Sequence, residues 1–301
     1  MGGEMLLRPL VVLTRHYPSS AVLVNSTAET SGRGADLANT LIDLGRPDEG
    51  LAEFEKAKAT WPSDPRLFVE WGHALKRLNR LKEAARHYKE ALPLLGRAIK
   101  AEPWNDWAAR NLGLVLNRLN RSEGALRWFL WAHRRFPEVV SILLELSEVL
   151  RQKARLAKVE AIRQQLYAEA EEKLQHAMEV DPWNTWPWRV WGYLCLDFQN
   201  PGEALEKFEA ALRLDPLDWS AWAGKGRALR QMKQYAKATK AFEHALFFRP
   251  NDHNLLIDFG ALLQDCGRHE EAIEKLERGL EINPLNRWAK DLLAKSEKFR
   301  K

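Results

Sequence analysis

Cysteine is scarce in this chain, because its 301 residues include only Cys195 and Cys266. Two cysteines cannot build a disulfide framework, and without a CxxC motif or a Cys/His cluster they predict no zinc site. Such usage is typical of proteins in a reducing compartment, so we expect a cytoplasmic protein.

Long apolar runs are equally scarce. The N-terminal apolar stretch LLRPLVVL is interrupted by Arg8 and Pro9, and it is too short to span a bilayer. No small-residue cleavage site follows it, so the pattern does not indicate a secretory signal peptide. We therefore expect no membrane insertion.

Motifs for catalysis are also few. The eight histidines are scattered, none has a nucleophile or a metal ligand at a meaningful spacing, and no glycine-rich phosphate loop occurs. The sequence thus predicts no catalytic residue, no metal, no cofactor and no enzymatic activity.

What the sequence does contain is a period of 34 residues. Prolines recur at this spacing at Pro103 and Pro137, and again at Pro182, Pro216, Pro250 and Pro284. Two longer gaps between prolines, of 41 and 45 residues, exceed the period by 7 and 11 residues. Because these excesses correspond to whole helical turns, they can lengthen helices without rotating their buried faces.

Small and aromatic residues keep the same phase. Before each proline, a trio such as Ala204, Phe208 and Ala211 recurs at relative positions 0, +4 and +7, which lie on one face of a helix. Upstream in each unit a second amphipathic helix carries a small residue at one place, as at Gly192 and Gly226. Matched small residues let two helices approach closely, so each unit predicts an antiparallel helix pair.

The segments WGYLCLDFQNPGEALEKFEAALRLDP (191–216) and FGALLQDCGRHEEAIEKLERGLEINP (259–284) resemble the tetratricopeptide repeat (TPR) family, whose 34-residue unit has a W…LG…Y…A…F…A…P pattern. The resemblance implies an all-α, right-handed superhelical solenoid of about sixteen helices. We expect seven repeats over residues 34–284, the second and fourth extended by insertions, and a capping helix over residues 285–301. Residues 1–33 are expected to hold a half-repeat and an irregular linker.

The resemblance also implies that the first helix of each pair lines the concave wall of the solenoid. The family's groove-facing slots fall on Arg66, His73, Lys76, Arg77, Trp107, Arg110, Arg118, Arg151, Trp186, Arg189, Tyr193, Arg227 and Arg230. The acids that oppose them are Asp43, Glu148, Asp197 and Asp265. We therefore expect a groove more basic than the chain as a whole, whose formal net charge is +5.

These residues predict a non-catalytic scaffold or adaptor for protein–protein interaction. Arginine binds carboxylates bidentately and packs on aromatic rings, so the groove suits an acidic, partly apolar peptide or protein segment. The expected apolar anchors are Trp107, Trp186 and Tyr193, and the expected charge contacts are Arg110, Arg189, Arg227 and Arg230.

Two alternatives stay open. One is a helical repeat that binds single-stranded nucleic acid on arginine and aromatic side chains. A base-reading code would repeat the same polar residues in each unit, whereas one such slot changes from Arg189 to Ala223 and Ile257, so nucleic acid is disfavoured. The other is a regulatory TPR portion of a larger enzyme or complex. The insertions and the open N-terminal end offer further surfaces, for docking or for a homo-oligomer.

Overall fold

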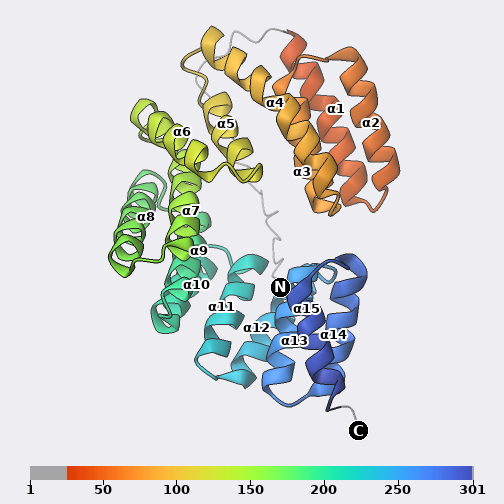
Figure 1. Ribbon diagram of the computed structural model, residues 1–301, viewed down its shortest axis with the longest axis vertical. Helices are drawn as coiled ribbons and strands as arrows, with labels where there is room; N and C mark the ends of the chain where they lie inside the picture. Colours follow the sequence, from red (N-terminus) through yellow and green to blue (C-terminus); the bar gives the residue numbers. More distant parts are fainter. Residues whose placement is uncertain (1–25, 300–301) are drawn as a thin grey trace, which may run out of the picture. The chain divides into compact units, whose positions relative to one another are not determined.

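The computed structural model describes residues 26–299, with side chains from residue 33 onward. This part of the chain contains 15 helices and no strand, and successive helices run antiparallel in pairs (Figure 1). The helices are α1 (Ser26–Asp43), α2 (Pro47–Thr60), α3 (Pro65–Arg77), α4 (Leu81–Ala101), α5 (Asp106–Arg118), α6 (Ser122–Arg135), α7 (Val140–Leu156), α8 (Glu160–Val180), α9 (Thr185–Asp197), α10 (Pro201–Leu214), α11 (Trp219–Gln231), α12 (Tyr235–Phe248), α13 (His253–Asp265), α14 (His269–Ile282) and α15 (Arg287–Glu297).

The chain divides into two compact units, residues 1–62 and residues 63–301. Among the described residues the first unit is the pair α1 and α2, and the second holds six pairs followed by α15. In the second unit each second helix packs on the first helix of the next pair, and the first helices from α5 to α13 also touch in succession. The predicted all-α repeat solenoid is confirmed.

The N-terminal expectation needs a correction. Helix α1 begins at Ser26, so the segment 26–33 is helical and not an irregular linker. Gly34 of the same helix approaches Ala57 and Trp61 at the end of α2, so the helix that packs on α2 continues N-terminally through this segment. The predicted half-repeat before Pro18 lies outside the described residues.

Close packing within each pair depends on a small residue facing a ring. Gly113 of α5 lies against Phe129 of α6, and Gly192 of α9 lies against Phe208 of α10. A Cβ atom on Gly192 would lie 2.7 Å from the Phe208 ring, which is far inside van der Waals contact. Both phenylalanines are fully buried, so each pair encloses its own part of the core.

The insertions lengthen particular helices. Helices α4 and α8 each have 21 residues, whereas α10 has 14, and α7 has 17 residues where α9 has 13. The corner between α7 and α8 exposes Leu156, Val159 and Ile162. A homo-oligomer contact through this corner stays a prediction.

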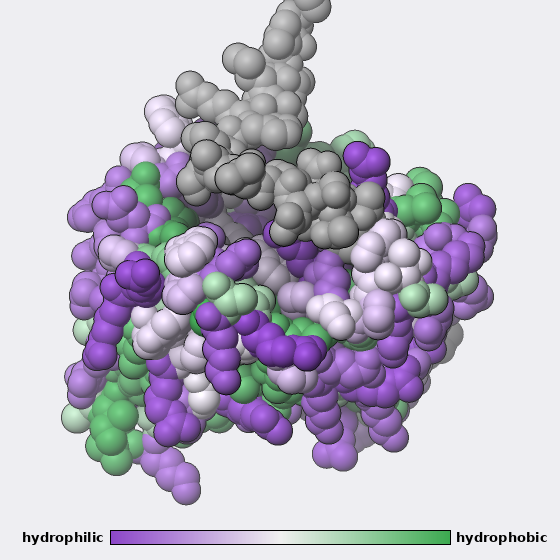
Figure 2. Space-filling model, turned by 90° about the horizontal axis from the view of Figure 1, so that it is seen from above, coloured by the Kyte–Doolittle hydropathy of each residue, from purple (hydrophilic) through white to green (hydrophobic). Residues whose placement is uncertain are grey.

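Hydrophilic side chains cover most of the surface seen in Figure 2, and apolar residues form small scattered patches between them. Between residues 26 and 299, no helix combines the length and the apolar character needed to cross a bilayer.

Candidate functional site

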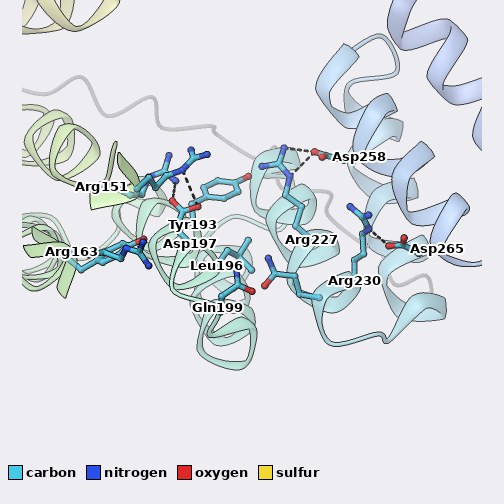
Figure 3. A pocket seen from close by; sticks show the side chains of 13 residues that line it. Arg151, Arg163, Tyr193, Leu196, Asp197, Gln199, Arg227, Arg230, Asp258 and Asp265 are labelled. Carbon is cyan, nitrogen blue, oxygen red and sulfur yellow. Dashed lines mark hydrogen bonds and ion pairs between the residues drawn. The ribbon is translucent and has the colours of Figure 1, made fainter. Parts of the chain in front are cut away.

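A cavity of about 980 Å³ opens along the first helices α7, α9, α11 and α13 of the second unit, with α8 contributing at one end. Figure 3 shows side chains from these successive helices extending toward one space. The charged residues that line it are Arg151, Arg155, Arg163, Arg227, Arg230, Asp197, Asp258 and Asp265. Five arginines against three aspartates leave the lining with two excess positive charges.

Arg151 of α7 is held between two carboxylates. It donates to Glu148 one turn earlier at 2.9 Å, and it also pairs with Asp197 at the end of α9. Burial on its own lowers the pKa of Arg151, but the hydrogen bonds and charges of Glu148 and Asp197 outweigh burial and raise it. Arg151 is therefore a permanent cation that joins α7 to α9.

Arg227 of α11 makes the next contact along the cavity. Its Nε donates to Asp258 of α13 at 2.7 Å, and its guanidinium lies 5.3 Å from the Tyr193 ring centroid. Burial raises the pKa of Asp258 while Arg227 opposes that rise. The Tyr193 hydroxyl donates to the backbone carbonyl of Ser220 at 3.1 Å, which fixes the ring beside the cavity.

The same relationship recurs along the second unit, where an arginine of one first helix pairs with an acid that lies in the next first helix or caps its start. We call these contacts the inter-repeat ion pairs: Arg110–Glu145, Arg151–Asp197, Arg189–Asp218, Arg227–Asp258 and Arg230–Asp265. These pairs neutralise much of the positive charge that the sequence predicts for the groove.

The sequence-based expectation therefore undercounted the opposing acids. Glu145, Asp218 and Asp258 were not included among them, although each pairs with a predicted groove arginine. A usable signal was present, because three of the five pairs are separated by 31 or 35 residues, close to one repeat. Searching for acids about one repeat after each arginine would have found Glu145 and Asp258.

The predicted aromatic anchors separate into two groups. Tyr193 lines the cavity, whereas Trp107 and Trp186 do not. The Trp107 ring lies 5.1 Å from the guanidinium of Arg66, a cation–π contact between α3 and α5. Trp186 is 39% exposed at the start of α9. Of the three anchors, Tyr193 alone contributes to the space between α7 and α13.

The profile of the tetratricopeptide repeat family matches residues 35–94, 80–139 and 190–253, which together cover more than half of the chain. The chain belongs to the tetratricopeptide repeat family. Repeats of this family generally serve as protein-interaction scaffolds with extended binding surfaces.

Two solved TPR structures are similar to this chain. A tetratricopeptide repeat protein from Parabacteroides merdae shares 18% identity over 89% of this chain and 99% of that chain, with a TM-score of 0.60. A thermophilic TPR protein from Thermus thermophilus shares 20% identity over 67% of this chain and 100% of that chain, with a TM-score of 0.58. No curated protein sequence matches this one. These likenesses concern the TPR fold alone.

The remaining predicted groove residues gather near the junction of α3 and α5 in the TPR array. His73 of α3 is surrounded by the positive charges of Arg118, Arg110, Lys76 and Arg77. Burial, and then these four cations, lower the pKa of His73 to about 4. His73 is therefore neutral at physiological pH, and positive charge dominates its surroundings.

Several cavity residues come from the extended fourth TPR unit and were missed by sequence reasoning. Arg155 lies at the end of α7, and Arg163 and Tyr167 lie on α8. The 34-residue pattern does not cover this extension, so it assigns none of these three residues to the groove and predicts a separate projecting surface. Burial raises the pKa of Tyr167 to about 12, so its hydroxyl stays protonated.

Metal binding and thiol chemistry find no support in this part of the TPR chain. Residues 33–299 contain no group of three or more His, Cys, Asp or Glu side chains arranged to hold a metal ion. Cys195 is buried, and burial raises its pKa to about 12, so it is a poor nucleophile. Cys266 is half-buried, and burial raises its pKa as well.

Proposed function

We propose that this TPR chain is a non-catalytic scaffold that binds an acidic, partly apolar peptide or protein segment in the cavity between α7 and α13. The observation that carries the proposal is the excess of two positive charges in a lining that also holds Tyr193 and Leu196. An extended segment with Asp or Glu beside an apolar residue matches both features.

Two arginines are available to such a ligand without loss of the inter-repeat ion pairs. Arg155 is 58% exposed, and its Nε lies 3.8 Å from Asp197, too far for a hydrogen bond. Arg163 is 41% exposed, and it pairs with Glu160 one turn away, outside the lining. Pairs this exposed contribute little to stability, so a ligand carboxylate can replace them at low cost. We therefore assign the charge contacts to Arg155 and Arg163.

Arg151, Arg227 and Arg230 play a different part in this proposal. Their carboxylate partners hold them in place, so they supply positive potential and shape to the cavity. Replacing Arg189 or Arg227 by glutamate would put two acids together and disturb the contact between repeats. Variants of these residues therefore do not separate binding from folding, whereas variants of Arg155 and Arg163 do.

The test uses fluorescence anisotropy with a labelled decapeptide of alternating Glu and Leu, and a matched peptide with Lys in place of Glu. We expect the full chain to bind the Glu peptide and to ignore the Lys peptide. Arg155→Gln with Arg163→Gln should weaken binding at least about tenfold, since each charge-assisted hydrogen bond contributes about 1.5–3 kcal/mol.

The matched control is Arg97→Gln on α4, an exposed arginine outside the cavity. It should leave the affinity for the Glu peptide unchanged. Equal binding of the two peptides, or equal affinity of the double variant and the original protein, would contradict the proposal.

The nucleic-acid alternative receives less support. A base-reading code would repeat the same polar residues in each unit, whereas the slot of Arg189 holds Ala223 and Ile257 in the next repeats. If a single-stranded oligonucleotide displaced the labelled Glu peptide from the chain, nucleic acid would become the favoured ligand. A place within a larger enzyme or complex, and a cytoplasmic location, stay predictions.

A further inference from the structure

A second cavity, of about 580 Å³, is lined by the ends of α3 and α5, the first half of α4 and Gln152 of α7. It shares no lining residue with the first cavity. Its charged lining residues are Lys76, Lys89 and Arg118, and no acid of the described chain lines it. The first cavity contains arginines matched by aspartates, so the two differ in chemistry.

The three cations lack ion-pair partners among the described residues. The nearby acids are engaged elsewhere, since Glu145 pairs with Arg110, and Glu148 pairs with Arg151 and accepts from Gln152. Burial and the charge of Arg118 lower the pKa of Lys76. After burial, the charges of Arg118 and Lys76 also contribute to the lowered pKa of His73 given above.

Tyr88 of α4 also lines this cavity. The side chain is 2% exposed, and its hydroxyl has no hydrogen-bond partner among the described residues. Burial raises the pKa of Tyr88 to about 12, so the hydroxyl is protonated and can donate. Buried polar groups nearly always have a partner, so this hydroxyl is available to donate to a group bound in the cavity.

Packing does not explain this hydroxyl. The Tyr88 ring lies against Gly72 of the first helix in its pair. In other repeats the same place is taken by rings without a hydroxyl, which lie against the equivalent glycine: Phe129, Phe208 and Phe242. A phenylalanine would therefore fill the core equally well at position 88.

We infer that this second cavity binds a phosphate monoester through Lys76, Lys89, Arg118 and the Tyr88 hydroxyl. A phosphate monoester carries nearly two negative charges and three acceptor oxygens, which suits three cations and a neutral donor better than a single carboxylate does. Leu81 and Leu119 add apolar surface for the group that carries the phosphate. The inference does not depend on the proposed peptide site.

Isothermal titration of the full chain with phenyl phosphate, benzoate and inorganic phosphate tests this site. We expect phenyl phosphate to bind at least about tenfold more tightly than benzoate, which has the same ring and one charge fewer. It should also bind more tightly than inorganic phosphate, because its ring contacts the leucines. Equal binding of benzoate, or no binding of phenyl phosphate, would overturn the inference.

Tyr88→Phe separates a ligand role from a structural one. We expect it to weaken phenyl phosphate binding about tenfold while the melting temperature stays the same or rises, because an unpaired buried hydroxyl is lost. Lys82→Gln, an exposed cation of α4 outside the lining, should leave binding unchanged. If Tyr88→Phe binds phenyl phosphate normally, the assignment of its hydroxyl is wrong and the inference fails.

Two further readouts identify the source of the phosphate and the place of binding. Tighter binding of a phosphotyrosine pentapeptide than of phenyl phosphate assigns the site to a phosphorylated partner, and equal affinity assigns it to a small ester. Bound phosphate should raise the pKa of His73 in NMR titrations, because it neutralises the surrounding cations. The Glu–Leu decapeptide should bind Tyr88→Phe normally, so the two proposed sites can fail separately.

Discussion

Arg227 of α11 donates to Asp258 of α13 at 2.7 Å, so one guanidinium joins the first helices of two successive repeats. The acid is 9% exposed, and the arginine also contacts the Tyr193 ring of the preceding repeat. In a solenoid each repeat contacts only its neighbours, so stability depends on the interfaces between them. This pair therefore serves both the cavity and the cohesion of the array.

Asp258→Ala should lower the free energy of unfolding by about 1.5–3 kcal/mol, because Arg227 then loses the acceptor of a charge-assisted hydrogen bond. Urea denaturation at pH 7 measures this change. The control is Glu271→Ala, which breaks the exposed pair with Arg268 at the start of α14 and should have no measurable effect. Equal effects of the two substitutions would show that the inter-repeat pair contributes nothing beyond a surface contact.

Gly192→Ala should destabilise the chain by about 1–3 kcal/mol, because the new Cβ atom would lie 2.7 Å from the buried Phe208 ring. Gly96→Ala in α4 is the matched helix substitution, since no neighbouring atom lies within 4 Å of its Cβ position. It should stabilise by about 0.5–1 kcal/mol through the lower conformational entropy of the unfolded chain. Changes of the same sign in urea denaturation would refute the close approach of α9 and α10.

His73 predicts a loss of stability in acid. Its folded-state pKa of about 4 lies below the ordinary value of 6.5, so the unfolded state binds the proton more readily. The stabilising contribution is complete above pH 6.5 and is lost as pH falls toward 4. The loss is at most about 3 kcal/mol, and solvent screening of this partly exposed side chain reduces it.

Urea denaturation at pH 7 and pH 4.5 tests this dependence on His73. His73→Gln removes the titrating group, so the variant should lose less stability between the two pH values than the original protein does. An identical loss in both proteins would assign the acid sensitivity to other groups.

The two cysteines should differ in reactivity toward iodoacetamide. Cys195 is 6% exposed with a pKa of about 12, whereas Cys266 is half-buried and its pKa is raised as well. We expect slow modification of Cys266 first and protection of Cys195 until the chain unfolds. Peptide mass spectrometry locates the label, and modification in urea should give equal rates. Faster labelling of Cys195 in the native protein would contradict its burial.

The repeat architecture could be predicted from the sequence because it depends on local periodicity. Ala204, Phe208 and Ala211 share one face of α10, and all three are fully buried. The glycine at position 192 faces the Phe208 ring as the matched small residues implied. Helix faces follow from 3.6-residue spacing alone, so this level of structure needs no knowledge of distant contacts.

The chemistry of both cavities depended on contacts between distant residues. Arg151 and Asp197 are 46 residues apart in the sequence. They meet because α9 packs beside α7 even though α7 and α8 are longer than the helices of other pairs. The sequence identified Arg151 as a groove cation, but its neutralising partner follows from how successive pairs pack. Likewise Tyr88 looked like an ordinary ring of the repeat, and the three-dimensional structure placed it in one cavity lining with Arg118 and Lys76. Charge balance is a sum over neighbours in space, so it could not be predicted from residue types along the chain.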